Sequence, residues 1–112
     1  IASLEGLETI VSLLLQVGAN PNQQDTFGAS PLIYTAQHKH LAVMQLLLAE
    51  KANTNLRDIE GETALMYAVS YRFKAGVEAL LASGADRQAS NFDNQTAEDK
   101  AFDPEIAALF EQ

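Results

Sequence analysis

The chain has 112 residues, enough for one compact domain and too few for two ordinary ones. Its composition, 47% hydrophobic and 20% charged, is typical of a folded protein and argues against intrinsic disorder. The net charge of −8 argues against general nucleic-acid binding, because phosphate would be repelled, and no apolar run approaches the roughly 18 residues of a membrane helix. The absence of cysteine excludes disulfides and cysteine-based zinc sites, and it is compatible with the cytoplasmic location that we expect.

The first predicted element is a buried helix over Ile10 to Val17, an apolar run interrupted by Ser12 and Gln16. It should end near Gly18, because glycine suits the left-handed residue that follows many helix C-termini.

A turn followed by two helices is predicted next. Asp25 can bond its own downstream backbone and Gly28 supplies a positive φ, so residues 25–28 should form the turn. Ser30 then caps a short helix whose first residue is Pro31, where a missing N–H costs nothing. The apolar stripe of a second helix is formed by Val43, Met44, Leu46, Leu47 and Leu48. Neither helix can bury its apolar face alone, so such units must stack.

The same elements recur with a fixed period of 33 residues and no gaps. The matched columns include Asp25, Asp58 and Asn91; Gly28, Gly61 and Asn94; Ser30, Thr63 and Thr96; and Ala19, Ala52 and Ala85. The period divides the chain into a partial repeat 1–24, repeats 25–57 and 58–90, and a C-terminal capping repeat 91–112.

Two stretches carry a recognisable signature. D-x-x-G-x-S-P-L-I-Y-T-A runs from Asp25 to Ala36, and D-x-x-G-x-T-A-L-M-Y-A-V runs from Asp58 to Val69. Together with L-L-L-Q-V-G-A-N at Leu13–Asn20, they resemble the ankyrin repeat, and the resemblance extends over essentially the whole chain. It implies an all-α solenoid of stacked helix-turn-helix units with β-turn or hairpin connections.

Several positions depart from that family pattern. The signature histidine is replaced by Ile33, Met66 and Asp99, and the glycine between the two helices is Lys39 or Arg72. Lys51 replaces a helix-ending glycine. Gly76 lies where the family buries Ile or Val, so we expect thinner packing there, at a cost of about 1 kcal/mol or more.

The two ends of the chain differ from the middle. Ala2 falls in the column of Thr35 and Ala68, so we expect residues 1–24 to continue a longer array. At the other end, Thr96 and Asp99 have the spacing of a capping box, and the link to the second helix is three residues shorter. Ile106, Leu109 and Phe110 then regain the apolar register, which predicts a terminal cap.

No residue pattern predicts chemistry, so we expect a non-enzyme with no metal and no cofactor. His38 and His40 are two residues apart, should point to different sides, and lack metal-ligand spacing; His40 should make a structural hydrogen bond. Glu60 and Glu62 are interpreted as two solvated turn charges. Lys39, Arg72 and Lys74 form either an anion-binding patch or ordinary snorkelling surface.

The resemblance implies that a partner lies against the turn tips and the first-helix face. The matching turn positions are Thr26, Phe27, Ala29, Ile59, Glu60, Glu62, Phe92, Asp93 and Gln95. The matching helix positions are Gln37, His38, Ser70 and Tyr71, with Leu4 and Glu5 from the first unit. Phe27 and Ile59 either mark an interaction site or pack against the adjacent hairpin.

The predicted groove is apolar with an acidic rim, so it suits a basic protein or peptide partner with apolar anchors. We expect a monomer that binds neither nucleic acid nor membrane. The leading hypothesis is a protein–protein interaction module. The alternative is a structural or regulatory segment that packs against other domains of a longer chain.

Overall fold

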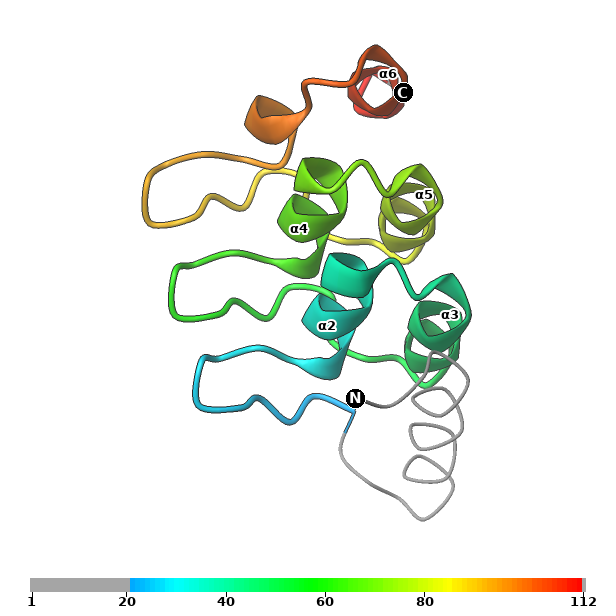
Figure 1. Ribbon diagram of the computed structural model, residues 1–112, viewed down its shortest axis with the longest axis vertical. Coiled ribbons are helices and arrows are strands. Elements are labelled where there is room, and N and C mark those ends of the chain that lie inside the picture. The colour runs from blue at the N-terminus through cyan, green and yellow to red at the C-terminus, as the bar shows by residue number, and fades with distance from the viewer. Residues whose placement is uncertain (1–20, 112) are drawn as a thin grey trace.

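The computed structural model describes residues 21–111, which form a stack of turns and helices in three columns (Figure 1). The helices are α2 (Pro31–His38), α3 (Leu41–Ala49), α4 (Ala64–Ser70), α5 (Lys74–Ala82), the 3-10 helix η1 (Glu98–Lys100) and α6 (Pro104–Leu109). In Figure 1 the extended turns project on the left, α2, α4 and η1 form the inner column, and α3, α5 and α6 form the outer one. Within the described range the only β-pairing is the isolated bridge between Ser90 and Thr96, so the predicted all-α solenoid is confirmed.

Predictions for the first 20 residues lie outside the described part of the chain. They include the helix over Ile10–Val17, the match at Leu13–Asn20 and the site positions Leu4 and Glu5. Between residues 21 and 111, no helix is both long enough and apolar enough to cross a bilayer.

The inner helices begin at the predicted caps. The Ser30 hydroxyl accepts a hydrogen bond from the Ile33 amide at 3.3 Å, and the Thr63 hydroxyl accepts one from the Met66 amide at 3.3 Å. Each satisfies one of the N–H groups that a helix start leaves without an intrahelical partner. The bond needs only a backbone donor, so it survives the loss of the family's histidine.

Non-glycine residues adopt the left-handed conformation wherever the expected glycine is missing. Lys39 and Arg72 both have φ of 57° between the inner and outer helices, and Lys51 has φ of 61° after α3. The left-handed region costs an L-residue about 1–2 kcal/mol, so the turn geometry is kept at some expense in stability.

The core lies between the inner and outer columns. Its fully buried side chains include Leu32, Ile33, Met44, Leu47, Leu65, Met66, Val77, Leu80 and Ile106. Ile33 and Met66 therefore place apolar groups at the position of the missing histidine. The apolar stripe predicted for the second helix included one residue too many, because Leu46 is 36% exposed whereas Leu47 beside it is buried.

The expected packing defect at Gly76 is absent. A Cβ built on Gly76 would lie 2.4 Å from Cδ2 of Phe73, and Phe73 is itself buried. The phenyl ring occupies the volume that a larger side chain at residue 76 would take. The prediction of thin packing was wrong because it rested on residue 76 alone. Residue 73 also differs from its counterpart in the preceding repeat, His40, and its phenyl ring fills the space.

The C-terminal segment, residues 91–111, packs against the core through its apolar side chains. Ile106 and Phe110 are buried and Leu109 is half-buried against the core. The Thr96 amide donates to Asp99 at 2.9 Å and the Asp99 amide donates to Thr96 at 3.2 Å, which is the reciprocal pattern of a capping box. It closes a single 3-10 turn rather than an α-helix.

Candidate functional site

Three turns of the same construction project from the inner helices. Oδ1 of Asp25 accepts the amides of Phe27 and Ala29, both at 2.9 Å. Oδ1 of Asp58 accepts the amides of residues 60 and 62, and Oδ1 of Asn91 accepts those of residues 93 and 95, at 2.9 and 3.0 Å in each case. One side-chain oxygen therefore fixes each turn from inside and leaves the tip side chains pointing outward.

Backbone hydrogen bonds hold adjacent tips side by side. The Ile59 amide donates to the Phe27 carbonyl at 3.1 Å, and the Phe92 amide donates to the Glu60 carbonyl at 3.2 Å. Gly28 permits this approach, since a Cβ there would lie 2.8 Å from Cα of Asp58 and its φ is +77°. The tips thus form a rigid row rather than independent loops.

The tips expose large apolar side chains. Phe27 is 66%, Ile59 61% and Phe92 69% exposed. Of the two interpretations of Phe27 and Ile59, burial against the neighbouring hairpin is therefore excluded. Three solvated apolar groups in one row are what an interaction surface presents.

A hollow of about 260 Å³, which we call the tip pocket, lies between the first two tips and the inner helices. Its lining combines apolar, aromatic and acidic groups: Phe27, Ala29, Tyr34, Gln37, Asp58, Ile59, Glu60 and Tyr67. Five of these residues were predicted to lie on the binding surface, and the fold brings them together: Phe27, Ala29, Gln37, Ile59 and Glu60.

Two tyrosines of the tip pocket were not predicted as site residues. The Tyr34 hydroxyl donates to Oδ2 of Asp25, and the Tyr67 hydroxyl donates to Oδ2 of Asp58. Each tyrosine follows its aspartate by nine residues in both repeats, and this repeated pairing of a donor with an acceptor was the signal available in the sequence. The bonds fix both phenol rings against the turns.

These hydrogen bonds shift the acidities of the groups involved. The bond from Tyr34 holds the pKa of the Asp25 carboxyl below its usual range, and the same bond raises the pKa of Tyr34. Burial, the bond to Asp58 and the negative charges of Asp58, Glu62 and Glu60 raise the pKa of the Tyr67 phenol well above its ordinary value. Asp58 and Glu60, two of the groups that raise the Tyr67 pKa, also line the tip pocket.

Aromatic stacking extends from the pocket along each inner helix. The rings of Tyr34 and His38 are 6.4 Å apart and nearly parallel, and those of Tyr67 and Tyr71 are 6.2 Å apart. His38 and Tyr71 are exposed, as the predicted binding surface requires. Of the other predicted positions, Thr26, Ser70, Asp93 and Gln95 are exposed, whereas Ala29 is buried.

Glu62 is not the solvated turn charge that its position suggested. It is only 7% exposed, its Oε1 lies 2.9 Å from the Lys100 ammonium, and the Asn91 amide donates to it at 2.7 Å. The exposed partner of the expected pair is Glu60 alone. Gly61, with φ of +81°, separates the two glutamates, and Asn91 and Lys100 of the C-terminal segment cover Glu62.

The histidines also differ from expectation. The left-handed Lys39 reverses the chain after α2, so the rings of His38 and His40 lie 6.1 Å apart instead of on different sides. The His40 side chain makes no capping hydrogen bond at the start of α3. Across residues 21–111, no group of three or more histidines and carboxylates is arranged to hold a metal ion.

The predicted cationic positions are all at the surface. Lys39, Arg72 and Lys74 are exposed, and Lys74 pairs with Glu105 of α6 at 3.6 Å. Nothing distinguishes these three side chains from ordinary surface residues.

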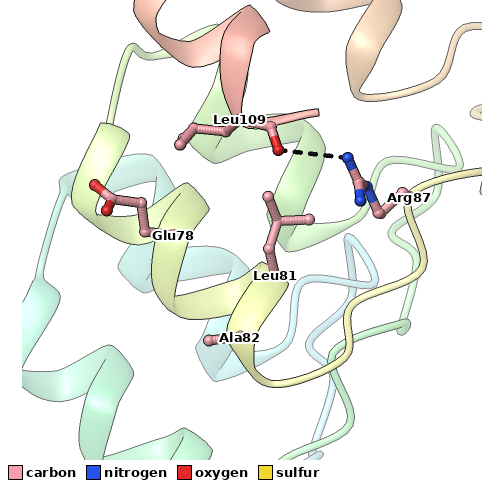
Figure 2. A pocket seen from close by; sticks show the side chains of 5 residues that line it. All are labelled: Glu78, Leu81, Ala82, Arg87 and Leu109. Atoms are coloured by element: carbon pink, nitrogen blue, oxygen red, sulfur yellow. Dashed lines mark hydrogen bonds between the residues drawn. The ribbon is translucent and has the colours of Figure 1, made fainter. Parts of the chain in front are cut away.

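A second hollow lies on the outer side of the stack, between α5 and α6 (Figure 2). It is lined by Glu78, Leu81, Ala82, Arg87 and Leu109, and it contains none of the predicted site residues. Arg87 donates to the Leu109 carbonyl at 3.4 Å, as Figure 2 shows, and its guanidinium lies 5.4 Å from the Phe110 ring. Through these contacts Arg87 links repeat 58–90 to the C-terminal segment.

Comparison with known proteins agrees with this architecture. The family model for ankyrin repeats, in three copies, matches residues 1–91. The crystal structure of the ankyrin repeat domain of Bcl-3, described as a unique member of the IkappaB protein family, superposes with a TM-score of 0.89 at 33% sequence identity. The match covers 96% of this chain and 47% of that structure, so the chain spans about half its length. No curated protein matches the sequence.

Proposed function

Because this chain belongs to the ankyrin-repeat family, whose repeats are generally protein–protein interaction modules, we propose that it is a non-catalytic module of that kind. In this proposal a protein or peptide partner binds the surface formed by the turn tips and the inner helices. The compartment we propose is the cytoplasm, and the module acts as a monomer.

The observation that carries the proposal is the row of exposed apolar tips at Phe27, Ile59 and Phe92. Their amides and carbonyls are tied together, so little conformational entropy is lost when a partner covers them. Large apolar and aromatic groups held rigidly on one face are the usual anchors of protein interfaces.

The charge of the surface favours a basic partner with apolar anchors. Glu60 and Asp93 are exposed beside the apolar tips, and the chain as a whole carries a net charge of −8. Complementary charge would steer such a partner and reject acidic ones.

The proposal can be tested by selecting peptides from a random display library on the immobilised chain. The affinity of the selected peptides is then measured for the chain, for the Tyr71→Ala/Phe92→Ala double variant, and for Phe102→Ala as a control. Among residues 21–111, Phe102 is the most exposed large apolar residue, at 87%, and it lies on the link between η1 and α6, outside the three turns. We expect the double variant to lose about tenfold or more in affinity, equivalent to about 1.4 kcal/mol.

Circular dichroism and urea unfolding should be nearly unchanged in all three proteins, since the three side chains are exposed. Equal affinity for the chain and the double variant would refute the proposed surface. Protection of Tyr71 and Phe92 from solvent in a longer form of the protein would favour the alternative, a segment that packs against its own chain.

A further inference from the structure

The tip pocket is lined for a cation. None of its eight lining residues is basic, whereas Asp58 and Glu60 are acidic. The basic residues of the neighbouring turns are engaged elsewhere: Lys100 pairs with Glu62 at 2.9 Å, and Arg57 donates to the Ser90 carbonyl at 3.0 Å. No basic side chain therefore lines the tip pocket beside Asp58 and Glu60.

The two carboxylates of the tip pocket differ in what they can still accept. Asp58 already accepts two backbone amides on one oxygen and the Tyr67 hydroxyl on the other. The carboxylate of Glu60 makes no hydrogen bond or ion pair with any residue between 21 and 111. Glu60 is thus the acceptor that a bound group would meet first.

The aromatic walls are held in place before any ligand arrives. Tyr34 is fixed by its hydrogen bond to Asp25 and by stacking on His38. Tyr67 is fixed in the same way by Asp58 and Tyr71. Aromatic faces attract cations, and the attraction is stronger where the group is partly desolvated.

We propose that the tip pocket binds the arginine side chain of a partner segment. The guanidinium would lie against Tyr34 and Tyr67 and donate to the Glu60 carboxylate, while Phe27 and Ile59 cover its methylene stem. The volume of about 260 Å³ suits one long side chain and is below the range of about 300–1,000 Å³ typical of small-molecule sites. Arginine fits better than lysine, because its planar, weakly hydrated cation stacks on rings and bonds carboxylates through a fork of N–H groups.

This inference rests on the proposed function, and it can be tested without a known partner. The probe is Nα-acetyl-arginine amide, titrated into isotopically labelled chain and followed by NMR. Matched probes carry citrulline, which is uncharged and nearly isosteric, lysine or norleucine. We expect arginine to bind at least fivefold more tightly than citrulline, with shifts concentrated at residues 27, 34, 59, 60 and 67.

The matched variants are Glu60→Gln and Glu50→Gln, which remove the same charge inside and outside the tip pocket. Glu60→Gln should weaken arginine binding at least threefold and leave citrulline unchanged, while Glu50→Gln changes neither. Equal affinity for arginine and citrulline, or tighter binding of norleucine or lysine, overturns the inference.

The arginine titration and the peptide selection together separate this inference from the proposed function. If display-selected peptides depend on Tyr71 and Phe92 but neither contain arginine nor respond to Glu60→Gln, the interaction surface stands and the arginine site falls. If the arginine probe binds the tip pocket while selected peptides ignore Tyr71 and Phe92, the proposed surface falls instead.

Discussion

The two repeats 25–57 and 58–90 and the C-terminal segment use the same sequence columns for different contacts. In each repeat a tyrosine hydroxyl donates to the aspartate that begins its own turn. In the C-terminal segment these columns hold Asn91 and Lys100, and both side chains reach Glu62 of the preceding repeat, at 2.7 and 2.9 Å. Residues in these two columns therefore make either a contact within one repeat or a contact with the preceding repeat.

The exchange of aspartate for asparagine explains how both tasks are met at once. Oδ1 of Asn91 still accepts the two turn amides, while its NH₂ donates to Glu62. An ionised aspartate has no donor and would face the Glu62 carboxylate with like charge. Asn91 thus keeps the turn and gains a contact between units.

The largest expected effect comes from removing the cation of the buried pair. Lys100→Met should lower the free energy of unfolding by about 3 kcal/mol, because it leaves the Glu62 carboxylate buried with its opposite charge removed. Lys74→Met is the control, since the Lys74 and Glu105 side chains are 47% and 76% exposed. It should cost about 0.5 kcal/mol or less by urea unfolding.

Adding Glu62→Gln to Lys100→Met should recover part of the loss, because the charge left unpaired is then gone. Similar small losses for Lys100→Met and Lys74→Met would show that water reaches Glu62 and that the C-terminal segment is not fastened by this pair.

The glycines of the turns test how closely the tips approach one another. Gly28→Ala should destabilise the chain by about 2 kcal/mol or more, since it combines a positive φ with a clash against the backbone of Asp58. Gly84→Ala also has a positive φ, of +86°, but has nothing within 4 Å, and should cost about 1 kcal/mol. Thermal or urea unfolding measures the difference, and equal losses would contradict close stacking of the tips.

In the C-terminal segment the column of Gly28 and Gly61 holds Asn94, which has a φ of 63°. Asn94→Gly should change stability by no more than about 0.5 kcal/mol, because asparagine tolerates this region well. A large stabilisation would mean that the third turn is strained relative to the first two.

The two repeats also differ from each other, because Phe73 and Gly76 of repeat 58–90 stand in the columns of His40 and Val43 of repeat 25–57. Gly76→Val alone should be destabilising, because its Cβ would meet the Phe73 ring at 2.4 Å. The Phe73→His/Gly76→Val variant should lose less unfolding free energy than the two single variants lose when their losses are added. In a double-mutant cycle we expect a coupling free energy of about 1 kcal/mol or more. Additive effects would show that the ring does not fill the space above residue 76.

The smallest effect concerns the exposed Asp25. Tyr34→Phe should raise the Asp25 pKa toward its ordinary value, because the bond that favours the carboxylate is lost. In the native chain the folded pKa is lowered, so this group's contribution to stability is full above its unfolded pKa and disappears as pH falls through the folded one. NMR titration of the Asp25 carboxyl checks the shift; an unchanged pKa would exclude the hydrogen bond in solution.

The repeat and its caps could be predicted because each depends on residues close in sequence. Asp25 and Gly28 bond within one turn, Ser30 reaches the amide three residues on, and the 33-residue period shows that the units stack. The exposed tip residues followed from the same columns. The tip pocket was not predicted. The sequence pattern indicates Tyr34 and Tyr67 only as helix residues, and it is the structure that shows their hydroxyls bonded to the turn aspartates.

The sequence alone determined the architecture and the row of tip side chains, since local hydrogen bonds and a strict period leave little freedom. Only the tertiary structure decided the environment of each side chain between units. It buried Glu62 under Lys100, filled the space at Gly76 with Phe73, and brought two acidic residues and two tyrosines from adjacent repeats around one pocket. The physical reason is that burial and charge pairing depend on which side chains the neighbouring repeat places nearby. The residue type at one position of a repeat does not specify those side chains.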